Sequence, residues 1–175
     1  MKTNILFLLI IQLMFITSCE LLFPDEKLTL PRTDFSVNGI RTDGYYYNLY
    51  NNVLGKRIAI VFLYKNGIVF SAGSYSNLNE AESEMVKYIS ENRRKKQNWG
   101  VFLIEGDRIE YERWERAIGG YNLIIRGHYG NIENDTTIHF TKTYSSETKK
   151  TDKIDFVYHF KKFDNKPDST NNFIK

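Results

Sequence analysis

Residues 44–163 have mostly the pattern of β-strands, and some stretches alternate apolar and polar side chains with a two-residue period. The clearest example is 153–163, although Val157 and Phe163 fall on its polar face. Such alternation indicates a strand with one face in a core and the other in solvent. The apolar face of this strand consists of Ile154, Phe156, Tyr158 and Phe160.

A second strand is apolar on both faces. Residues 58–64 form an unbroken apolar run, long enough for a strand buried on both sides and too short for a typical helix. Asn66-Gly67 follows, and residues 68–70 are apolar again. An Asn-Gly pair between two apolar runs is typical of a β-hairpin, and a type I′ turn there requires positive φ at both residues. We therefore expect a hairpin with this turn.

One segment has the helical period instead. Residues 79–96 place apolar side chains on one face and charged side chains on the other. Asn79 is the expected N-cap, with Glu82 completing a capping box, and the basic run at 93–96 suits the C-terminal end of a helix dipole. This amphipathic helix should cover one opening or one side of the sheet. Its apolar face consists of Leu78, Ala81, Met85 and Ile89.

Further strands complete a mostly β fold. In 108–114, Glu110 and Glu112 share a face that we expect in solvent, and Trp114 breaks the alternation, which predicts a bulge or strand end near Arg113. About eight strands joined mostly by short turns favour an antiparallel meander, closed as a lipocalin-like barrel or folded as a two-layer sheet. The other expected strands begin at 45–47 and cover 101–104, 121–125 and 136–144.

The start of the chain has the features of a secretory signal. Lys2 precedes a short apolar run that is too brief to span a hydrocarbon core of about 30 Å. The run ends in Ile16-Thr17-Ser18-Cys19, which resembles the lipobox of bacterial lipoproteins. The resemblance implies cleavage before Cys19 and acylation of that residue, with acyl chains such as palmitate. Cys19 is the only Cys in the chain, so no intramolecular disulfide competes for its thiol.

This signal sets the expected organisation of the chain. Residues 1–18 are the signal peptide, 19–43 the acylated anchor and tether, 44–163 a single β-rich domain, and 164–175 a frayed polar tail. The net charge of +3 is too small to indicate a nucleic-acid partner.

A stretch within the domain also resembles known proteins. Trp99-Gly100, Gly106-Asp107 and the flanking apolar residues, up to Ile109, resemble a pattern in small, uncharacterised lipoproteins of Bacteroidetes, several of which look like lipocalin-type meander barrels. The resemblance covers residues 44–163 and supports the fold more than any function.

Catalytic and metal chemistry have little support in the sequence. His128, His139 and His159 lack the spacing of metal ligands, so we expect no metal and no cofactor. There is no Gly-x-Ser-x-Gly elbow. Glu110 and Glu112 lie about 7 Å apart along a strand. Such a carboxylate pair could support glycoside hydrolysis only if it flanked a cleft.

Aromatic residues, 15% of the chain, are its one compositional excess. Most should fill a β core, and a subset could line a cavity for one small apolar ligand. Two tripeptides, Asp135-Thr136-Thr137 and Asp168-Ser169-Thr170, resemble the O-glycosylation motif of Bacteroidetes and mark Thr136 and Ser169. The expected cavity residues are Tyr47, Phe62, Trp99, Tyr111, Phe156 and Tyr158.

These patterns favour a lipid-anchored binding or interaction module of the cell envelope, without enzymatic activity and expected at the outer membrane. Its partners would be the membrane, through the lipid, and a small apolar ligand or an envelope protein, with no nucleic acid. One alternative is a structural envelope subunit that contacts a partner protein. A third is a hydrolase acting on envelope glycan or lipid.

Overall fold

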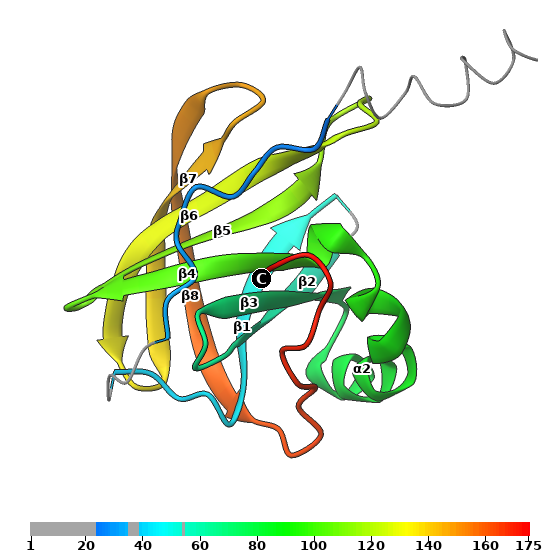
Figure 1. Ribbon diagram of the computed structural model, residues 1–175. Coiled ribbons are helices and arrows are strands. Elements are labelled where there is room, and N and C mark those ends of the chain that lie inside the picture. Colours follow the sequence, from blue (N-terminus) through cyan, green and yellow to red (C-terminus); the bar gives the residue numbers. More distant parts are fainter. Residues whose placement is uncertain (1–23, 35–38, 54) are drawn as a thin grey trace, which may run out of the picture.

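The computed structural model describes residues 24–34, 39–53 and 55–175. Within these residues, eight strands follow one another as an antiparallel meander that closes into a barrel through pairing of β1 with β8 (Figure 1). The mostly β fold with one helix and a lipocalin-like barrel is thus confirmed. The strands are β1 (Gly44–Asn52), β2 (Gly55–Leu63), β3 (Ile68–Tyr75), β4 (Trp99–Glu105), β5 (Arg108–Arg116), β6 (Leu123–Asn134), β7 (Thr137–Ser145) and β8 (Lys150–Lys162).

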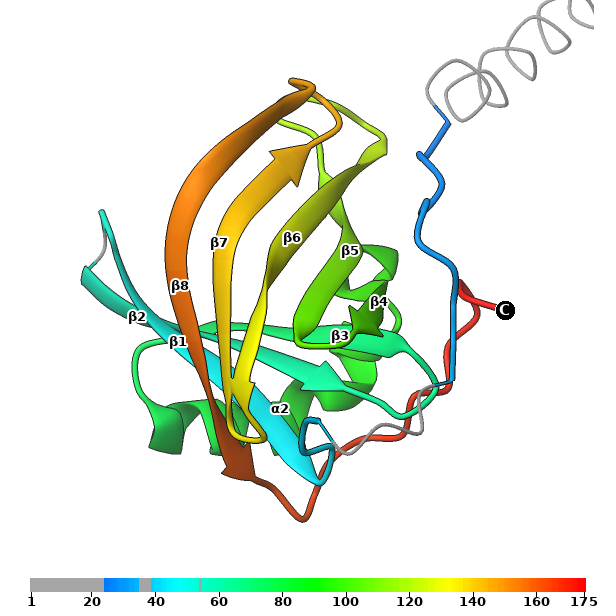
Figure 2. The same ribbon diagram turned by 90° about the vertical axis from the view of Figure 1, so that its left-hand side faces the viewer.

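The two ends of the barrel differ. We call the end that carries the β1–β2, β5–β6 and β7–β8 connections the mouth, and Figure 2 shows these connections in its upper part. The opposite end carries the β2–β3, β4–β5 and β6–β7 turns. Residues 39–43 cross that opposite end, where the backbone N–H of Arg41 donates to the carbonyl of Asp135. Residues 39–43 therefore cover the end of the barrel opposite the mouth.

The interior of the barrel holds one of two apolar clusters. We call it the interior core, and it draws residues from seven of the eight strands. In it, the ring of His128 stacks on Tyr111 with centroids 4.4 Å apart, and Phe140 packs edge-on against Tyr111 and Tyr158. The buried apolar members are Ile40, Tyr46, Val61, Leu63, Val69, Phe102, Ile109, Tyr111, Ile138, Phe140 and Tyr158.

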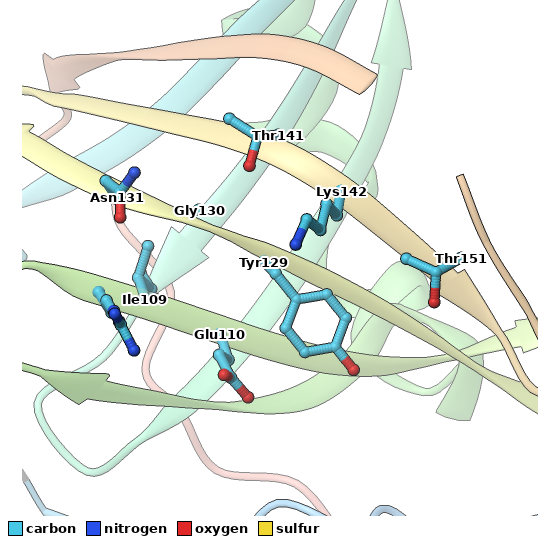
Figure 3. Close-up of a pocket in the computed structure, with 9 residues that line it drawn as sticks. Ile109, Glu110, Tyr129, Gly130, Asn131, Thr141, Lys142 and Thr151 are labelled. Carbon is cyan, nitrogen blue, oxygen red and sulfur yellow. The ribbon is translucent and has the colours of Figure 1, made fainter. Parts of the chain in front are cut away.

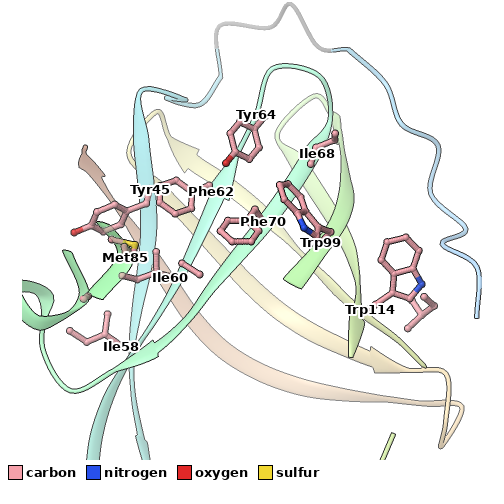
Figure 4. Packing of buried hydrophobic residues seen from close by; sticks show 13 residues of the cluster. Tyr45, Ile58, Ile60, Phe62, Tyr64, Ile68, Phe70, Met85, Trp99 and Trp114 are labelled. Atoms are coloured by element: carbon pink, nitrogen blue, oxygen red, sulfur yellow. The ribbon is translucent and has the colours of Figure 1, made fainter. Parts of the chain in front are cut away.

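A second cluster, the outer core, lies on the outside of strands β1–β4 (Figure 4). Successive residues of β2 enter different cores, since Phe62 is in the outer core and Leu63 in the interior core. This confirms that the apolar run at 58–64 forms a strand buried on both faces. The buried members are Tyr45, Ile58, Ile60, Phe62, Tyr64, Ile68, Phe70, Ala72, Ala81, Met85, Trp99, Trp114 and Ile125.

The helix α2 (Leu78–Arg93) covers part of the outer core through Ala81 and Met85. It therefore lies on one side of the sheet. It begins earlier than predicted, because the side chain of Asn77, not Asn79, caps it by accepting from the backbone N–H of Glu80 at 2.8 Å. It also ends before residue 96, and a short 3-10 helix, η1 (Lys96–Asn98), leads into β4.

Two local predictions need correction. The β2–β3 hairpin exists, but its turn is not type I′, because Gly67 has φ of 74° while Asn66 is not among the described non-glycine residues with positive φ. Nor does β5 bulge near Arg113: its pairing with β6 runs without a shift as far as Arg116. Trp114 breaks the polar pattern because it belongs to the outer core, where its indole N–H donates to the carbonyl of Glu26.

The described N-terminal segment is held against the outside of β5 and β6. The carboxylate of Glu112 accepts hydrogen bonds from the backbone N–H of Thr29 at 2.7 Å, from its hydroxyl at 2.6 Å and from the N–H of Leu30 at 3.0 Å. Glu112 is consequently 6% exposed, so its expected place in solvent is wrong. The segment at 26–30 belongs to the folded domain and is not a loose tether.

The C-terminal tail is also packed, and the expectation of a frayed end is wrong. Phe173 and Ile174 contact the outer core. The ammonium group of Lys166 donates to the carbonyls of Thr42 and Leu63 at 2.6 and 2.7 Å, and it lies 4.2 Å from the centroid of the Tyr64 ring. Burial lowers the pKa of Lys166 to about 8.

Substitution of Glu112 tests the attachment of the N-terminal segment. In Glu112→Gln, an amide replaces a charged acceptor of three hydrogen bonds, so the free energy of unfolding should fall by about 1–3 kcal/mol. Hydrogen exchange of the Thr29 and Leu30 amides should also become faster. Glu110→Gln, on the same face of the same strand, is the control. Equal effects of the two substitutions would contradict the assigned role of Glu112.

The buried imidazole of His128 predicts a pH dependence of stability. Burial, reinforced by Arg113 and Arg126, lowers its pKa to about 3, whereas the unfolded chain takes up this proton near pH 6.5. Stability is therefore fully present above pH 6.5 and is lost as the pH falls toward 3. Between pH 7 and pH 4.5, urea unfolding of the wild type should lose about 2 kcal/mol more than that of His128→Gln. Parallel losses in the two proteins would contradict the assignment.

Candidate functional site: the barrel mouth

The six aromatic residues expected to line a ligand cavity lie on both sides of the sheet. Tyr111 and Tyr158 are buried in the interior core, and Phe156 packs against it. Phe62 and Trp99 are buried in the outer core, and Tyr47 packs against that cluster. The barrel wall separates the two sets, so the six do not line one cavity. Consecutive strand residues point to opposite faces, and the sequence does not say which of two apolar faces is the inner one.

The mouth half of the barrel interior is polar. Strand alternation gives its lining, because residues two positions apart share a face. On β5, Arg113 lies two positions after the interior residue Tyr111. On β6, its cross-strand partner Arg126 lies two positions before the interior residue His128. Ser145 on β7 pairs with Arg126. These side chains form a polar layer between the interior core and the mouth.

The opposite wall of the mouth adds Tyr50 and Arg57, which are cross-strand partners on β1 and β2. Arg57 shares its face with Val61, an interior-core residue. The hydroxyl of Tyr50 lies 2.8 Å from that of Ser74. Tyr50 also contributes to the raised pKa of the buried Tyr158, after burial and Tyr111, which places it near the interior core.

Positive charge exceeds negative charge in this layer. The Glu115 carboxylate lies 2.9 Å from Nε of Arg126 and 3.4 Å from a terminal nitrogen of Arg113. Within the described residues, Arg57 forms no ion pair. The pKa of Glu80 is lowered mainly by a hydrogen bond from the Ser76 hydroxyl, and Arg57 adds to this shift. The opposite charges of Lys150 and Asp152, which are exposed on the same face of β8, offset each other. Two guanidinium groups, those of Arg113 and Arg126, therefore share one close carboxylate.

Three buried polar atoms in this layer lack a hydrogen-bond partner within the described part of the chain. They are Nε of Arg57, Nδ1 of His128 and Oγ of Ser145. Buried polar atoms are normally paired, and leaving one unpaired costs about 1–3 kcal/mol. His128 is neutral because its pKa is about 3, so its imidazole has one donor and one acceptor nitrogen. The layer thus contains both unused donors and unused acceptors.

Strand β1 extends toward the mouth beyond its pairing with β8. The pairing of β1 with β8 ends at Tyr47 and His159, although β1 continues to Asn52. Beyond that point the amide of Asn48 donates to the carbonyl of Val157 at 2.8 Å. Figure 2 shows the β1–β2 hairpin diverging from β8 toward the mouth.

A hollow of about 550 Å³ also lies on the outside of the barrel, across β5, β6 and β7 (Figure 3). Glu110, Tyr129 and Lys142 line it, with Asn131 and Thr151 at its edges. It is open and lies where β6 and β7 depart from regular pairing, at Tyr129/Gly130 and Phe140/Lys142. It holds the carboxylate of Glu110 but not that of Glu112, which binds the N-terminal segment. The carboxylate pair required for glycoside hydrolysis is not assembled there.

The remaining predicted sites are placed as follows. Thr136 lies in the β6–β7 turn with its hydroxyl donating to Asn134, and the hydroxyl of Ser169 accepts from the amide of Asn66. His139 lies between Glu133 and Asp155, and the described residues contain no group of three or more metal-binding side chains placed to hold an ion. Cys19 and the signal at 1–18 lie outside the described residues.

Sequence reasoning missed the arginine layer. In 108–114, Ile109 and Tyr111 alternate with Glu110 and Glu112, and Arg113 continues the face of Ile109 and Tyr111, which points inward. A signal was present, since an Arg at the end of an apolar alternation points into the barrel if the strand is regular. The expectation of a bulge near Arg113 prevented this assignment, because a bulge would interrupt the alternation.

Comparison of the chain with protein-family models, with curated proteins and with solved structures finds no match in any of the three.

Proposed function

We propose that this protein is a lipid-anchored binding protein of the cell envelope, and that its barrel mouth binds a small ligand through an anionic group. The observation that carries the proposal is the polar layer of the mouth, in which Arg113 and Arg126 share one close carboxylate, Glu115, while Arg57 lies on the opposite wall. Guanidinium groups bind carboxylates and phosphates through paired, charge-assisted hydrogen bonds. The function is binding without catalysis.

The packing supports an anionic head group over a wholly apolar ligand. The interior core fills the closed half of the barrel with buried side chains such as Phe102, Phe140 and Ile109. The mouth half supplies the unpartnered atoms of His128 and Ser145 beside the arginines. An anion there would accept hydrogen bonds from the guanidinium groups and from the Ser145 hydroxyl.

The lipid anchor is supported by the motif Ile16-Thr17-Ser18-Cys19. In the described residues, no helix has the length and apolar character needed to cross a membrane. A diacylated or triacylated Cys19 gives stable attachment because each buried CH₂ contributes about 0.8 kcal/mol. The protein would then be held at the outer membrane, the location that we propose.

Calorimetric titration with octyl phosphate tests the binding site. Arg113→Gln and Arg126→Gln should each weaken binding by about tenfold or more, because each removes a charged hydrogen bond worth about 1.5–3 kcal/mol. Arg108→Gln is the matched control, since Arg108 is exposed at the far end of the same strand. Titration with octanol tests whether the alkyl chain of the ligand is enough for binding without the phosphate.

The outcomes separate the alternatives. Tight binding of octyl phosphate that depends on Arg113 and Arg126 supports the proposal. Equal binding of octanol and octyl phosphate, or affinity unchanged by both substitutions in correctly folded protein, overturns it in favour of an apolar ligand or of no ligand at the mouth.

The anchor is tested separately by Cys19→Ser. This variant should lose incorporation of a labelled acyl precursor and should leave the membrane fraction, either as secreted protein or as uncleaved precursor retained by its signal. Incorporation of the acyl label into the Ser variant would contradict acylation at Cys19.

A further inference from the structure

The most exposed large apolar side chains lie at the mouth. Among the described residues, Val53, Ile118 and Tyr121 have exposures of 101%, 88% and 90%. Val53 lies in the β1–β2 connection, and the other two lie in the β5–β6 loop. Single exposed apolar residues are ordinary. Three of them on the connections of one barrel end form a pattern that marks an interaction surface.

Basic side chains accompany these residues. Lys56 and Arg116 flank the two connections, and Lys149 and Lys150 lie at the β7–β8 turn. All four are exposed, and Glu147 is the one exposed acid in that turn. Apolar tips surrounded by Lys and Arg are typical of protein surfaces that bind the lipid–water interface, where tyrosine is also favoured. We call Val53, Ile118, Tyr121 and these four basic residues the rim.

The path of the N-terminal segment places the expected anchor beside the rim. Asp25 accepts from the backbone N–H of Leu123 at 2.8 Å, and the N–H of Glu26 donates to the carbonyl of Leu123 at 2.9 Å. Leu123 begins β6, two residues after Tyr121. Lys96 adds an ion pair with Asp25 at 2.8 Å. Figures 1 and 2 both show this segment reaching the barrel at the mouth end, next to the β5–β6 loop.

Chain length then decides which end can meet the membrane. Pro24 is five positions after Cys19, and an extended chain reaches at most about 3.5 Å per position, roughly 18 Å in all. Strand β8 has 13 residues, a length of about 43 Å at 3.3 Å per residue. A lipid on Cys19 therefore holds the mouth near the bilayer and cannot bring the closed end to it.

We propose that the rim docks on the bilayer that holds the lipid, with Val53, Ile118 and Tyr121 entering the interfacial region. The inference rests on the lipid anchor of the proposed function. The basic residues of the rim face the phosphates of the head groups, and the barrel mouth opens toward the membrane. The anionic ligand therefore reaches the arginine layer from the membrane side.

Fluorescence quenching by brominated lipid tests the docking. The full-length lipidated protein is reconstituted in phosphatidylcholine vesicles containing phosphatidylglycerol, and Ile118→Trp adds a reporter to the rim. Bromine on the upper acyl chain should reduce the added fluorescence about twofold, as expected for an indole at the membrane interface. Val86→Trp, at an exposed apolar position of α2 away from the mouth, is the matched control and should not be quenched. The unsubstituted protein gives the background from the buried Trp99 and Trp114.

Three outcomes are distinguishable. Quenching of Ile118→Trp but not of Val86→Trp supports docking, and its reduction by Val53→Ser and Tyr121→Ser in the same protein confirms the rim. Vesicle-bound protein with no quenching at either position overturns docking and leaves the anchor intact. Protein that carries no acyl chain and stays free of the vesicles overturns the anchor, and with it the docking proposal.

Discussion

The strands β1–β4 are apolar on both faces, and this constraint organises the rest of the molecule. A closed barrel removes sheet edges but buries only one face of each strand. The outer faces of Tyr45, Phe62, Phe70 and Trp99 would otherwise meet water. They are covered by α2, by the described N-terminal segment and by the C-terminal tail, all of which contribute to one outer core. The domain therefore extends beyond its eight strands.

The covering segments are attached by polar contacts at a few points. Glu112 accepts three hydrogen bonds from residues 29 and 30, and Lys166 donates to two carbonyls that come from different parts of the chain. Buried charged groups are tolerated when their hydrogen-bonding capacity is filled, as it is at Glu112. These contacts also fix where the chain leaves the domain, so the attachment of the N-terminal segment to β6 determines which barrel end lies near the proposed anchor.

The barrel interior is divided between stability and the proposed function. Its closed half is a packed apolar core, whereas its mouth half contains three arginines, one close glutamate and a neutral histidine. Unpartnered buried polar atoms reduce stability, and their concentration in one layer is typical of a binding site. The pairing between β1 and β8 ends at Tyr47, before β1 reaches the mouth.

The sequence by itself determined the β class, the approximate strands, the hairpin at 64–67 and the single amphipathic helix, because these depend on local periodicity and turn chemistry. It also contains Ile16-Thr17-Ser18-Cys19, the local motif on which the proposed lipid anchor rests. Only the tertiary structure decided which face of each strand is the inner one. Phe62 and Leu63 are equally apolar neighbours, yet they lie in different cores because the barrel closes around one of them. The same closure turned Arg113 and Arg126 inward, and long-range contacts buried Glu112 and packed both terminal segments. Contacts between residues 83 to 124 positions apart, such as Glu112 with Thr29 and Lys166 with Thr42, leave no periodic pattern in the sequence, so only the folded structure shows them.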